Sequence, residues 1–147
     1  MKENLFDKIG IKQPRRYSYG KYIVGASKLY MSDLDMIKIG LLLLGKGIYQ
    51  KTKILSEYSI SKLFTPVFAR DSDKFTYLSE DFYTFGFWKS KNQTVIASGT
   101  GGQIIALLSD ENIIIVTTND RSDDLSDSIK GDVNNLIKFI KGDINGL

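Results

Sequence analysis

The fold of this chain is decided by the stretch Ile104-Ile105-Ala106-Leu107-Leu108-Ser109-Asp110-Glu111-Asn112-Ile113-Ile114-Ile115-Val116-Thr117. It holds two apolar runs on either side of the polar turn Ser109-Asp110-Glu111-Asn112. Runs of this composition, bounded by turn residues, predict β-strands. Because the turn has the length of a hairpin connection, we expect the two strands to pair antiparallel.

A glycine-dense segment leads into the first of these strands. It reads Ala97-Ser98-Gly99-Thr100-Gly101-Gly102-Gln103. Small and flexible residues in a row weaken a strand, so such a segment usually marks a place where a ligand or another backbone comes very close. The candidate substrate-binding residues all belong to this segment. They are Ser98, Gly99, Thr100, Gly101, Gly102 and Gln103.

The first strong helix is predicted to begin after Ser32, a good N-cap residue with Asp35 three positions on. Apolar residues recur at helical spacing along it, and further apolar residues fall on its other faces. The regularly spaced set is Leu34, Ile37, Leu41 and Leu44. A helix that is apolar on several sides is expected to be buried.

Two more helices and a third strand complete the predicted elements. A short helix is expected from Ser56 to just before Pro66, and a C-terminal helix carries an apolar stripe over residues 125–140. Residues 83–88 are aromatic and predict a strand, whereas residues 65–81 predict a polar loop. The expected fold class is α+β, with an antiparallel sheet of about three strands and flanking helices.

The length of 147 residues predicts one domain with room for a core. Its expected parts are an irregular N-terminal segment (1–31), a portion of a helical subdomain (32–81), and strands plus the C-terminal helix (82–147). The N-terminus has no apolar core of a signal peptide, and no apolar run is long enough to span a bilayer. A cytoplasmic location is therefore expected for the sequence as written.

The composition excludes several chemistries. With no histidine and no cysteine, the chain has no Ser-His-Asp triad, no thiolate nucleophile and no cysteine-type zinc site. The acidic groups Asp71/Asp73 and Asp123/Asp124/Asp127 are interpreted as a solvated loop and a helix start, so neither a metal nor a cofactor is expected. A net charge of +3 is too mild to predict a nucleic-acid partner.

The order of these pieces is more specific than any one of them. The pieces are the helix over residues 30–44, Phe85-Gly86-Phe87-Trp88, Gly99-Thr100-Gly101-Gly102-Gln103, and a strand ending Thr117-Thr118-Asn119. Together they resemble the C-terminal half of the β-lactamase-related serine hydrolases, a family of class C β-lactamases, penicillin-binding DD-peptidases and related esterases. The resemblance runs from about Phe6 to Ile140. It implies a partial β-lactamase/DD-peptidase-like fold.

In that family, acyl transfer passes through a serine ester. Its motifs are Ser-x-x-Lys at a helix start, a Tyr-x-Asn or Ser-x-Asn loop, and a Lys-Thr-Gly or His-x-Gly strand. The resemblance gives only the third a counterpart, Gly99-Thr100-Gly101, whose backbone would lie along the substrate and help to form the oxyanion hole. Thr100 would hydrogen-bond a substrate carboxylate. Many members have Lys or His where this chain has Ser98 or Gly99, although some hydrolases of the family read Gly-x-Gly-Gly-Gln here.

Two segments inside the chain also match Ser-x-x-Lys: Ser18 to Lys21 and Ser59 to Lys62. Roughly two such matches are expected by chance in this composition. The first lies in the irregular N-terminal segment. The second lies on the short predicted helix, which the resemblance places away from the reaction centre. Ser90-Lys91-Asn92 imitates a Ser-x-Asn loop but predicts an ordinary turn.

The resemblance implies that two strands and the nucleophile helix of intact relatives have no counterpart here. The outer edge of the strand at 113–117 would then be open, and a helix face would be exposed. We therefore expect the chain to be inactive alone and to associate with a separately encoded N-terminal half or with itself. Intact relatives, which act on small acyl substrates or peptides, are often exported or attached to the cell envelope.

Two alternatives remain open at this point. One is a non-catalytic module that binds a peptide or glycan in a groove along Gly99–Gln103. The other is a small complete enzyme that uses Ser59 and Lys62, or Ser18 and Lys21. Covalent labelling of a serine would be required by the second alternative.

Overall fold

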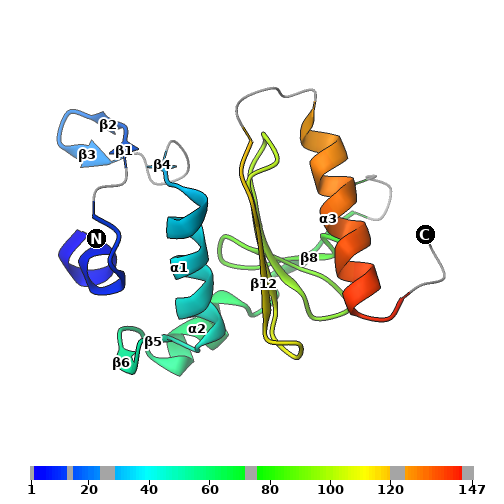
Figure 1. The fold of residues 1–147 in the computed structure, drawn as a ribbon, viewed down its shortest axis with the longest axis horizontal. Coiled ribbons are helices and arrows are strands. Elements are labelled where there is room, and N and C mark those ends of the chain that lie inside the picture. The colour runs from blue at the N-terminus through cyan, green and yellow to red at the C-terminus, as the bar shows by residue number, and fades with distance from the viewer. Residues whose placement is uncertain (1, 13–14, 24–28, 72–75, 120–124, 144–147) are drawn as a thin grey trace.

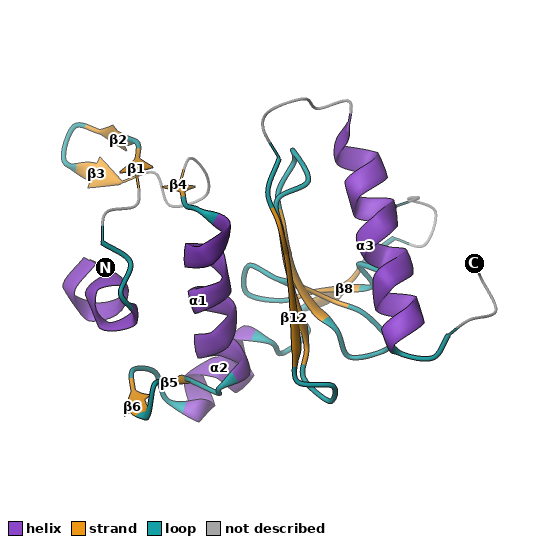
Figure 2. Ribbon diagram, in the orientation of Figure 1, coloured by secondary structure: helices purple, strands orange, loops and turns teal. Residues whose placement is uncertain are grey.

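The computed structural model describes residues 2–12, 15–23, 29–71, 76–119 and 125–143. These residues form an α+β fold in which a six-stranded antiparallel sheet lies between two helices (Figures 1 and 2). Helix α1 (Asp33–Leu44) covers one face of the sheet, and helix α3 (Ser126–Ile140) covers the other. The predicted α+β class with an antiparallel sheet is confirmed.

The strand order of the sheet is β12-β11-β10-β9-β8-β7, so each strand pairs with its neighbours in the sequence. The strands are β7 (Phe68–Ala69), β8 (Phe82–Tyr83), β9 (Trp88–Lys89), β10 (Val95–Ser98), β11 (Ile104–Leu108) and β12 (Ile113–Thr117). The predicted hairpin of β11 and β12 is confirmed, with Ala106 opposite Ile115 at its centre.

The expectation of about three strands is wrong, because the sheet has six. Strands β7, β8 and β9 have two residues each, which is too short for strand periodicity to show. The segment 83–88, expected to be one strand, is a hairpin. Its turn is closed by the Thr84 N–H, which donates to the Phe87 carbonyl at 2.9 Å, and Gly86 within it has a φ of +94°. Strand β7 lies within the segment expected to be a polar loop.

Strand β11, which lies next to the end strand β12, contributes side chains to two separate cores. Ile104, Ala106 and Leu108 belong to the core under α3, whereas Ile105 and Leu107 belong to the core under α1. This division follows from the alternation of side chains along a strand. Strand β11 is buried along its whole length, but β12 is only partly buried because β11 is its one neighbour in the described sheet.

Helix α1 begins where predicted, since Ser32 Oγ accepts the Asp35 N–H at 3.2 Å. The expectation that this helix would be buried holds for Met36, Gly40, Leu42 and Leu43, but not for three of its regularly spaced apolar residues. Leu34, Ile37 and Leu41 are 66%, 36% and 45% exposed. We call these three residues the α1 stripe.

Two other sides of α1 are buried instead. Gly40 lies against Ile114 of β12, on the side that faces the sheet. Leu42 packs into a separate cluster with Phe6, Ile9 and Ile11 of the N-terminal segment. The α1 stripe meets neither surface, which is why it stays exposed although it is apolar.

The two other predicted helices are confirmed as α2 (Glu57–Leu63) and α3. Ser56 caps α2, because its Oγ accepts the Ser59 N–H at 3.0 Å. Helix α3 stops shortly before Gly142, which has a φ of +75° and serves as the predicted glycine stop.

In the described part of the N-terminal segment, all elements are short. They are η1 (Lys2–Phe6), η2 (Asp7–Ile9), the pair β1 (Arg15–Arg16) and β4 (Leu29–Tyr30), and the pair β2 (Ser18–Tyr19) and β3 (Tyr22–Ile23). A further small pair, β5 (Ile48–Tyr49) and β6 (Thr52–Lys53), follows α1. Within the described parts of the chain, every helix is too short or too polar to cross a membrane.

Candidate functional site

The predicted binding segment forms the turn between β10 and β11, which lies at the top of the sheet in Figure 1. The Gly99 N–H donates to the Gln103 carbonyl at 2.8 Å, and the Gly102 N–H donates to the Gly99 carbonyl at 3.3 Å. The side chain of Gln103 folds back over the turn, where its Oε1 accepts the Gly101 N–H at 3.2 Å. Because Ser98 ends β10, all six predicted residues lie in or next to one compact turn.

Three side chains that sequence analysis missed hold this turn in place. They come from β12, from the residues just after it, and from the start of α3. The bonds run from Ser126 Oγ to the Thr100 carbonyl at 2.6 Å, from Asn119 Nδ2 to the Gly101 carbonyl at 3.0 Å, and from Thr117 Oγ1 to the Gly102 carbonyl at 2.7 Å. The sequence signal for these anchors was the presence of polar residues, Thr117 and Asn119, at and just after the end of the apolar strand β12. The turn backbone is thus fixed before any ligand arrives.

The glycines of the turn are explained by contacts within the protein. A Cβ on Gly99 would lie 2.7 Å from Oε1 of Gln103, and one on Gly101 would lie 2.7 Å from its Nε2. Gly102 has a φ of +80°, and a Cβ there would lie 3.2 Å from Ile129 of α3. The close approach that the glycines predicted is therefore made to Gln103 and to α3, and these contacts require no ligand.

Strand β10 ends in an unpaired piece of backbone. Its ladder with β9 stops at Ile96, opposite Trp88, whereas its ladder with β11 continues to Ser98, opposite Ile104. Backbone groups alternate in direction along an antiparallel strand. Because the Gly99 N–H points toward β11, the N–H and C=O of Ser98 point toward the β9 side, where no described strand pairs with them. We call these two groups the Ser98 edge.

The Ser-x-x-Lys match on α2 is not arranged as a catalytic pair. Ser59 Oγ lies 2.7 Å from Ser56 Oγ, within the helix cap. The Lys62 Nζ lies 5.5 Å from the centroid of the Tyr58 ring. In Figure 1, α2 lies at the end of the sheet opposite the β10–β11 turn. Both residues therefore serve local structure, away from the candidate site.

The match from Ser18 to Lys21 lies in the exposed hairpin of β2 and β3. Its lysine Nζ lies 5.4 Å from the centroid of the Tyr22 ring, a cation–π contact within the same hairpin. A serine becomes nucleophilic only when a base lies within hydrogen-bond reach. The described contacts give Ser18 no such base.

Ser90-Lys91-Asn92 forms the turn between β9 and β10, as the sequence predicted. Ser90 Oγ hydrogen-bonds with Asn92 Oδ1 and accepts the Thr94 N–H at 3.0 Å. Ser90 is fully buried. Its hydroxyl therefore holds the turn and is closed off from substrate.

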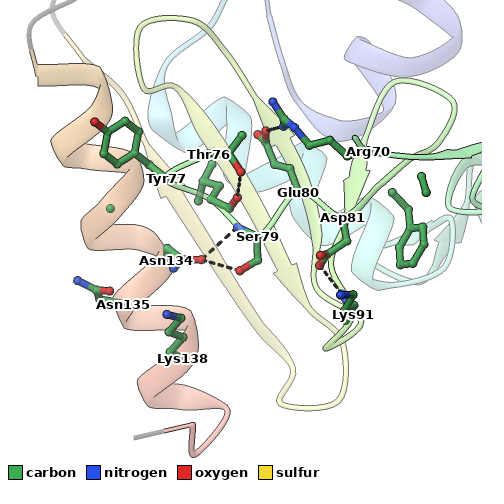
Figure 3. A pocket seen from close by; sticks show the side chains of 14 residues that line it. Arg70, Thr76, Tyr77, Ser79, Glu80, Asp81, Lys91, Asn134, Asn135 and Lys138 are labelled. Carbon is green, nitrogen blue, oxygen red and sulfur yellow. Dashed lines mark hydrogen bonds and ion pairs between the residues drawn. The ribbon is translucent and has the colours of Figure 1, made fainter. Parts of the chain in front are cut away.

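A cavity of about 620 Å³ lies between α3 and the residues 69–70 and 76–82 (Figure 3). Polar residues line it from both sides, with Ser79, Glu80 and Asp81 on one side and Asn134 and Lys138 of α3 on the other. The Ser79 N–H and Oγ both donate to Asn134 Oδ1, at 3.1 and 2.9 Å. The candidate turn does not line this cavity.

The remaining polar groups of the cavity are largely used within the protein. Arg70 Nη1 pairs with Glu80 Oε2 at 2.6 Å, and its guanidinium lies 4.9 Å from the centroid of the Trp88 ring. The Lys91 N–H donates to Asp81 Oδ2 at 2.8 Å. These bonds join Arg70 to Glu80 and Asp81 to the β9–β10 turn, so these three side chains along the cavity are held by contacts within the protein.

Within the described ranges, no three Asp, Glu, His or Cys side chains gather as a metal site requires. Of the acidic groups noted in the sequence, Asp71 and Asp127 are described, whereas Asp73, Asp123 and Asp124 lie outside the described residues.

Comparison of the chain with models of known protein families gives no match, and no curated protein matches it either. A functional assignment therefore rests on the geometry of the β10–β11 turn and the Ser98 edge.

Proposed function

We propose that this chain forms one wall of the acyl-substrate cleft of a β-lactamase-related serine hydrolase. An extended acyl or peptide substrate lies along the Ser98 edge and adds a strand to β10. The observation that carries the proposal is that the N–H and C=O of Ser98, beyond the last β9 pair at Ile96, have no strand partner among the described residues. The Ser98 N–H is a donor of the kind that stabilises a developing oxyanion.

The anchored turn supports this role. Hydrogen bonds from Thr117, Asn119 and Ser126 fix three successive carbonyls, the first of them two residues after Ser98. Donors that are already in place stabilise developing charge better than mobile ones, because no reorganisation is needed during the reaction. The backbone at Ser98 is therefore suited to bind an extended substrate in one register.

The proposal assigns no nucleophile to this chain. Ser59 is bonded to Ser56, and Lys62 lies over Tyr58, so neither serves the other. The Ser-x-x-Lys and Tyr-x-Asn groups come from outside these 147 residues, and the isolated chain is inactive. Hydrolysis requires both parts, because activation of the serine needs an adjacent base.

A non-catalytic binding module is the second candidate. The same Ser98 edge favours it, since strand addition needs only backbone groups and no nucleophile. The ligand would then be a peptide or glycan that is bound along β10 and not cleaved.

Intact-mass analysis after treatment with a fluorescent penicillin and a fluorophosphonate tests the catalytic assignment. We expect no adduct on the folded chain. A stoichiometric adduct would overturn the proposal, and the modified serine would identify a nucleophile within this chain.

Binding to the Ser98 edge is tested by NMR titration of the ¹⁵N-labelled chain with an acylated D-alanyl-D-alanine peptide. We expect the Ser98 amide signal to shift. Ser98→Pro removes the donor and should weaken binding about tenfold, the effect of one hydrogen bond of about 1.4 kcal/mol. Ser98→Ala keeps the N–H and should bind like the parent. Equal binding by the proline and alanine variants would exclude strand addition at this edge.

A further inference from the structure

Strand β12 leaves two sets of backbone groups without a partner. It is the end strand of the sheet, and only β11 pairs with it among the described residues. The bond from the Gly99 N–H to the Gln103 carbonyl fixes the direction of the backbone groups in β10 and β11, because direction alternates along each strand. The pairing of β11 with β12 carries this alternation on to the end strand. In β12, the N–H and C=O of Ile114 and Val116 therefore point away from β11, toward the open edge.

The α1 stripe borders this open edge. Gly40 lies over Ile114 of β12, so it marks the line on α1 that faces the end strand. Each residue of a helix is turned by about 100° from the one before it. Ile37 and Leu41 therefore lie on one side of Gly40, and Met36 lies on the other. Because Met36 packs in the core toward the middle of the sheet, Ile37 and Leu41 must lie toward the open edge.

Helix α3 brings a second apolar strip to the same edge from the other face of the sheet. Val133 is buried against the sheet, while Asn134 and Lys138 face the cavity on the β7–β8 side. Leu136 and Phe139 lie on the other side of Val133, which is the side of β12. They are 45% and 62% exposed. Figure 1 looks onto this edge, with α1 and α3 on either side of β12.

Strand β12 itself lacks three of the devices by which proteins prevent unwanted strand pairing. Such devices are charged residues, proline and bulges. Strand β12 reads Ile-Ile-Ile-Val-Thr and pairs with β11 without a bulge. An apolar edge of this kind, flanked by two apolar helix strips, is a surface for association.

We propose that this face, made of β12, the α1 stripe and the exposed strip of α3, is a dimer interface occupied by a second copy of the chain. The two β12 strands pair antiparallel about a two-fold axis perpendicular to the sheet. A rotation about that axis does not exchange the two faces of the sheet. The α1 helices of both copies therefore lie on one face and meet each other, and the α3 helices meet on the other face. Each apolar strip therefore meets its own copy, as an isologous interface requires.

The backbone register supports this arrangement. With Ile115 on the axis, Ile114 of one copy lies opposite Val116 of the other. Both residues point their N–H and C=O groups outward, so they form hydrogen-bonded pairs on each side of the axis. Their side chains also lie on the same face, since both pack in the core under α1.

The dimensions of the face suit a dimer. Five residues make β12 about 17 Å long, and twelve residues make α1 about 18 Å long. The face spans three layers, α1, the sheet and α3, which are spaced about 10 Å apart. Its flat projection therefore covers on the order of 500 Å². The two copies together would bury on the order of 1,000 Å², which is the low end for a specific interface and fits a weak, reversible dimer. The inference does not rest on the proposed hydrolase function, and a companion polypeptide that paired with this same edge would exclude it.

Sedimentation velocity of the full 147-residue chain over a range of concentrations tests the interface. We expect a reversible dimer of twice 16.6 kDa. Leu41→Lys places a charge in the middle of the interface and should raise the dissociation constant at least about tenfold. Val116→Pro removes an outward N–H without touching the β11 ladder and should act in the same direction. Circular dichroism confirms that each variant is folded.

Val67→Lys provides the matched control, because Val67 is also an exposed apolar residue but precedes β7, the opposite edge of the sheet. It should leave the dissociation constant unchanged. A chain that is monomeric at every concentration would overturn the proposal. So would an open-ended series of larger assemblies, a dimer insensitive to both Leu41→Lys and Val116→Pro, or a dimer broken by Val67→Lys. A monomer that binds a different polypeptide through Leu41 would assign the face to another partner and would also overturn it.

Discussion

Gly40 of α1 lies directly over Ile114 of β12, and a Cβ on Gly40 would stand 2.8 Å from Cγ2 of Ile114. The missing side chain lets the helix approach the end strand closely. The same contact fixes the rotation of α1 about its axis. That rotation determines that Met36 is buried and that Leu41 is exposed.

Gly40→Ala is expected to destabilise the protein, although alanine has the higher helix propensity by about 1 kcal/mol. Overpacking against a branched core residue costs about 1–3 kcal/mol, so the net loss should be up to about 2 kcal/mol. Urea denaturation measures it. Ile114→Ala removes the opposing methyl groups, and in that background Gly40→Ala should be neutral or stabilising. Strict additivity of the two changes would show that this contact does not limit the approach of the helix.

Gly102→Ala is expected to destabilise the β10–β11 turn by about 1–2 kcal/mol, the cost of a left-handed backbone conformation for an L-residue. The φ of +80° and the contact with Ile129 both oppose a side chain there. Thermal or urea unfolding measures the loss. Gly131→Ala is the matched control, because a Cβ at this position of α3 meets nothing within 4 Å. It should stabilise by up to about 1 kcal/mol through helix propensity. Equal effects of the two substitutions would contradict the assigned strain.

Thr117→Val is expected to loosen the candidate site while keeping its shape. The substitution removes the hydroxyl that donates to the Gly102 carbonyl at 2.7 Å. Leaving a buried carbonyl without its donor costs about 1–3 kcal/mol. Amide hydrogen exchange should rise in residues 99–103, and the unfolding midpoint should fall. Thr118→Val, at the exposed neighbouring position, should change neither quantity.

The pKa of Glu111 is lowered, chiefly by its hydrogen bond with Lys141, whose Nζ lies 2.9 Å from Oε1. A carboxyl with a lowered folded-state pKa binds fewer protons in the folded state than in the unfolded state. Its contribution to stability is therefore present above the unfolded pKa and is lost as the pH falls through the folded pKa. Lys141→Gln should raise the pKa of Glu111, as ¹³C NMR titration of the carboxyl would show. The variant's free energy of unfolding should also fall less steeply than the parent's as the pH is lowered. A Glu111 titration that is unchanged in the variant would exclude Lys141 as the cause.

Local sequence patterns were sufficient for the longer elements. The apolar runs of β11 and β12 and the stripe of α3 have the periodicity of their own secondary structure, and Ser32 and Ser56 marked two helix starts correctly. Patterns failed where elements were short. Two-residue strands such as β9 show no periodicity, because their pairing is decided by the strands beside them.

The candidate turn shows a different kind of limit. The sequence located the six residues from Ser98 to Gln103, but it could not show which neighbour required the glycines. That neighbour is partly the Gln103 side chain and partly Ile129. The anchoring hydroxyl of Ser126 is 26 residues away from the carbonyl it bonds, so only the folded chain brings the two together.

The amino-acid sequence by itself determined which segments are apolar and with what period, and hence that the chain forms an antiparallel hairpin between two helices. Only the tertiary structure decided which apolar faces are covered. Helical spacing shows that Leu34, Ile37 and Leu41 share a side of α1, but burial depends on what packs there. The contact of Gly40 with the end strand turns that side outward, beside the open edge of β12.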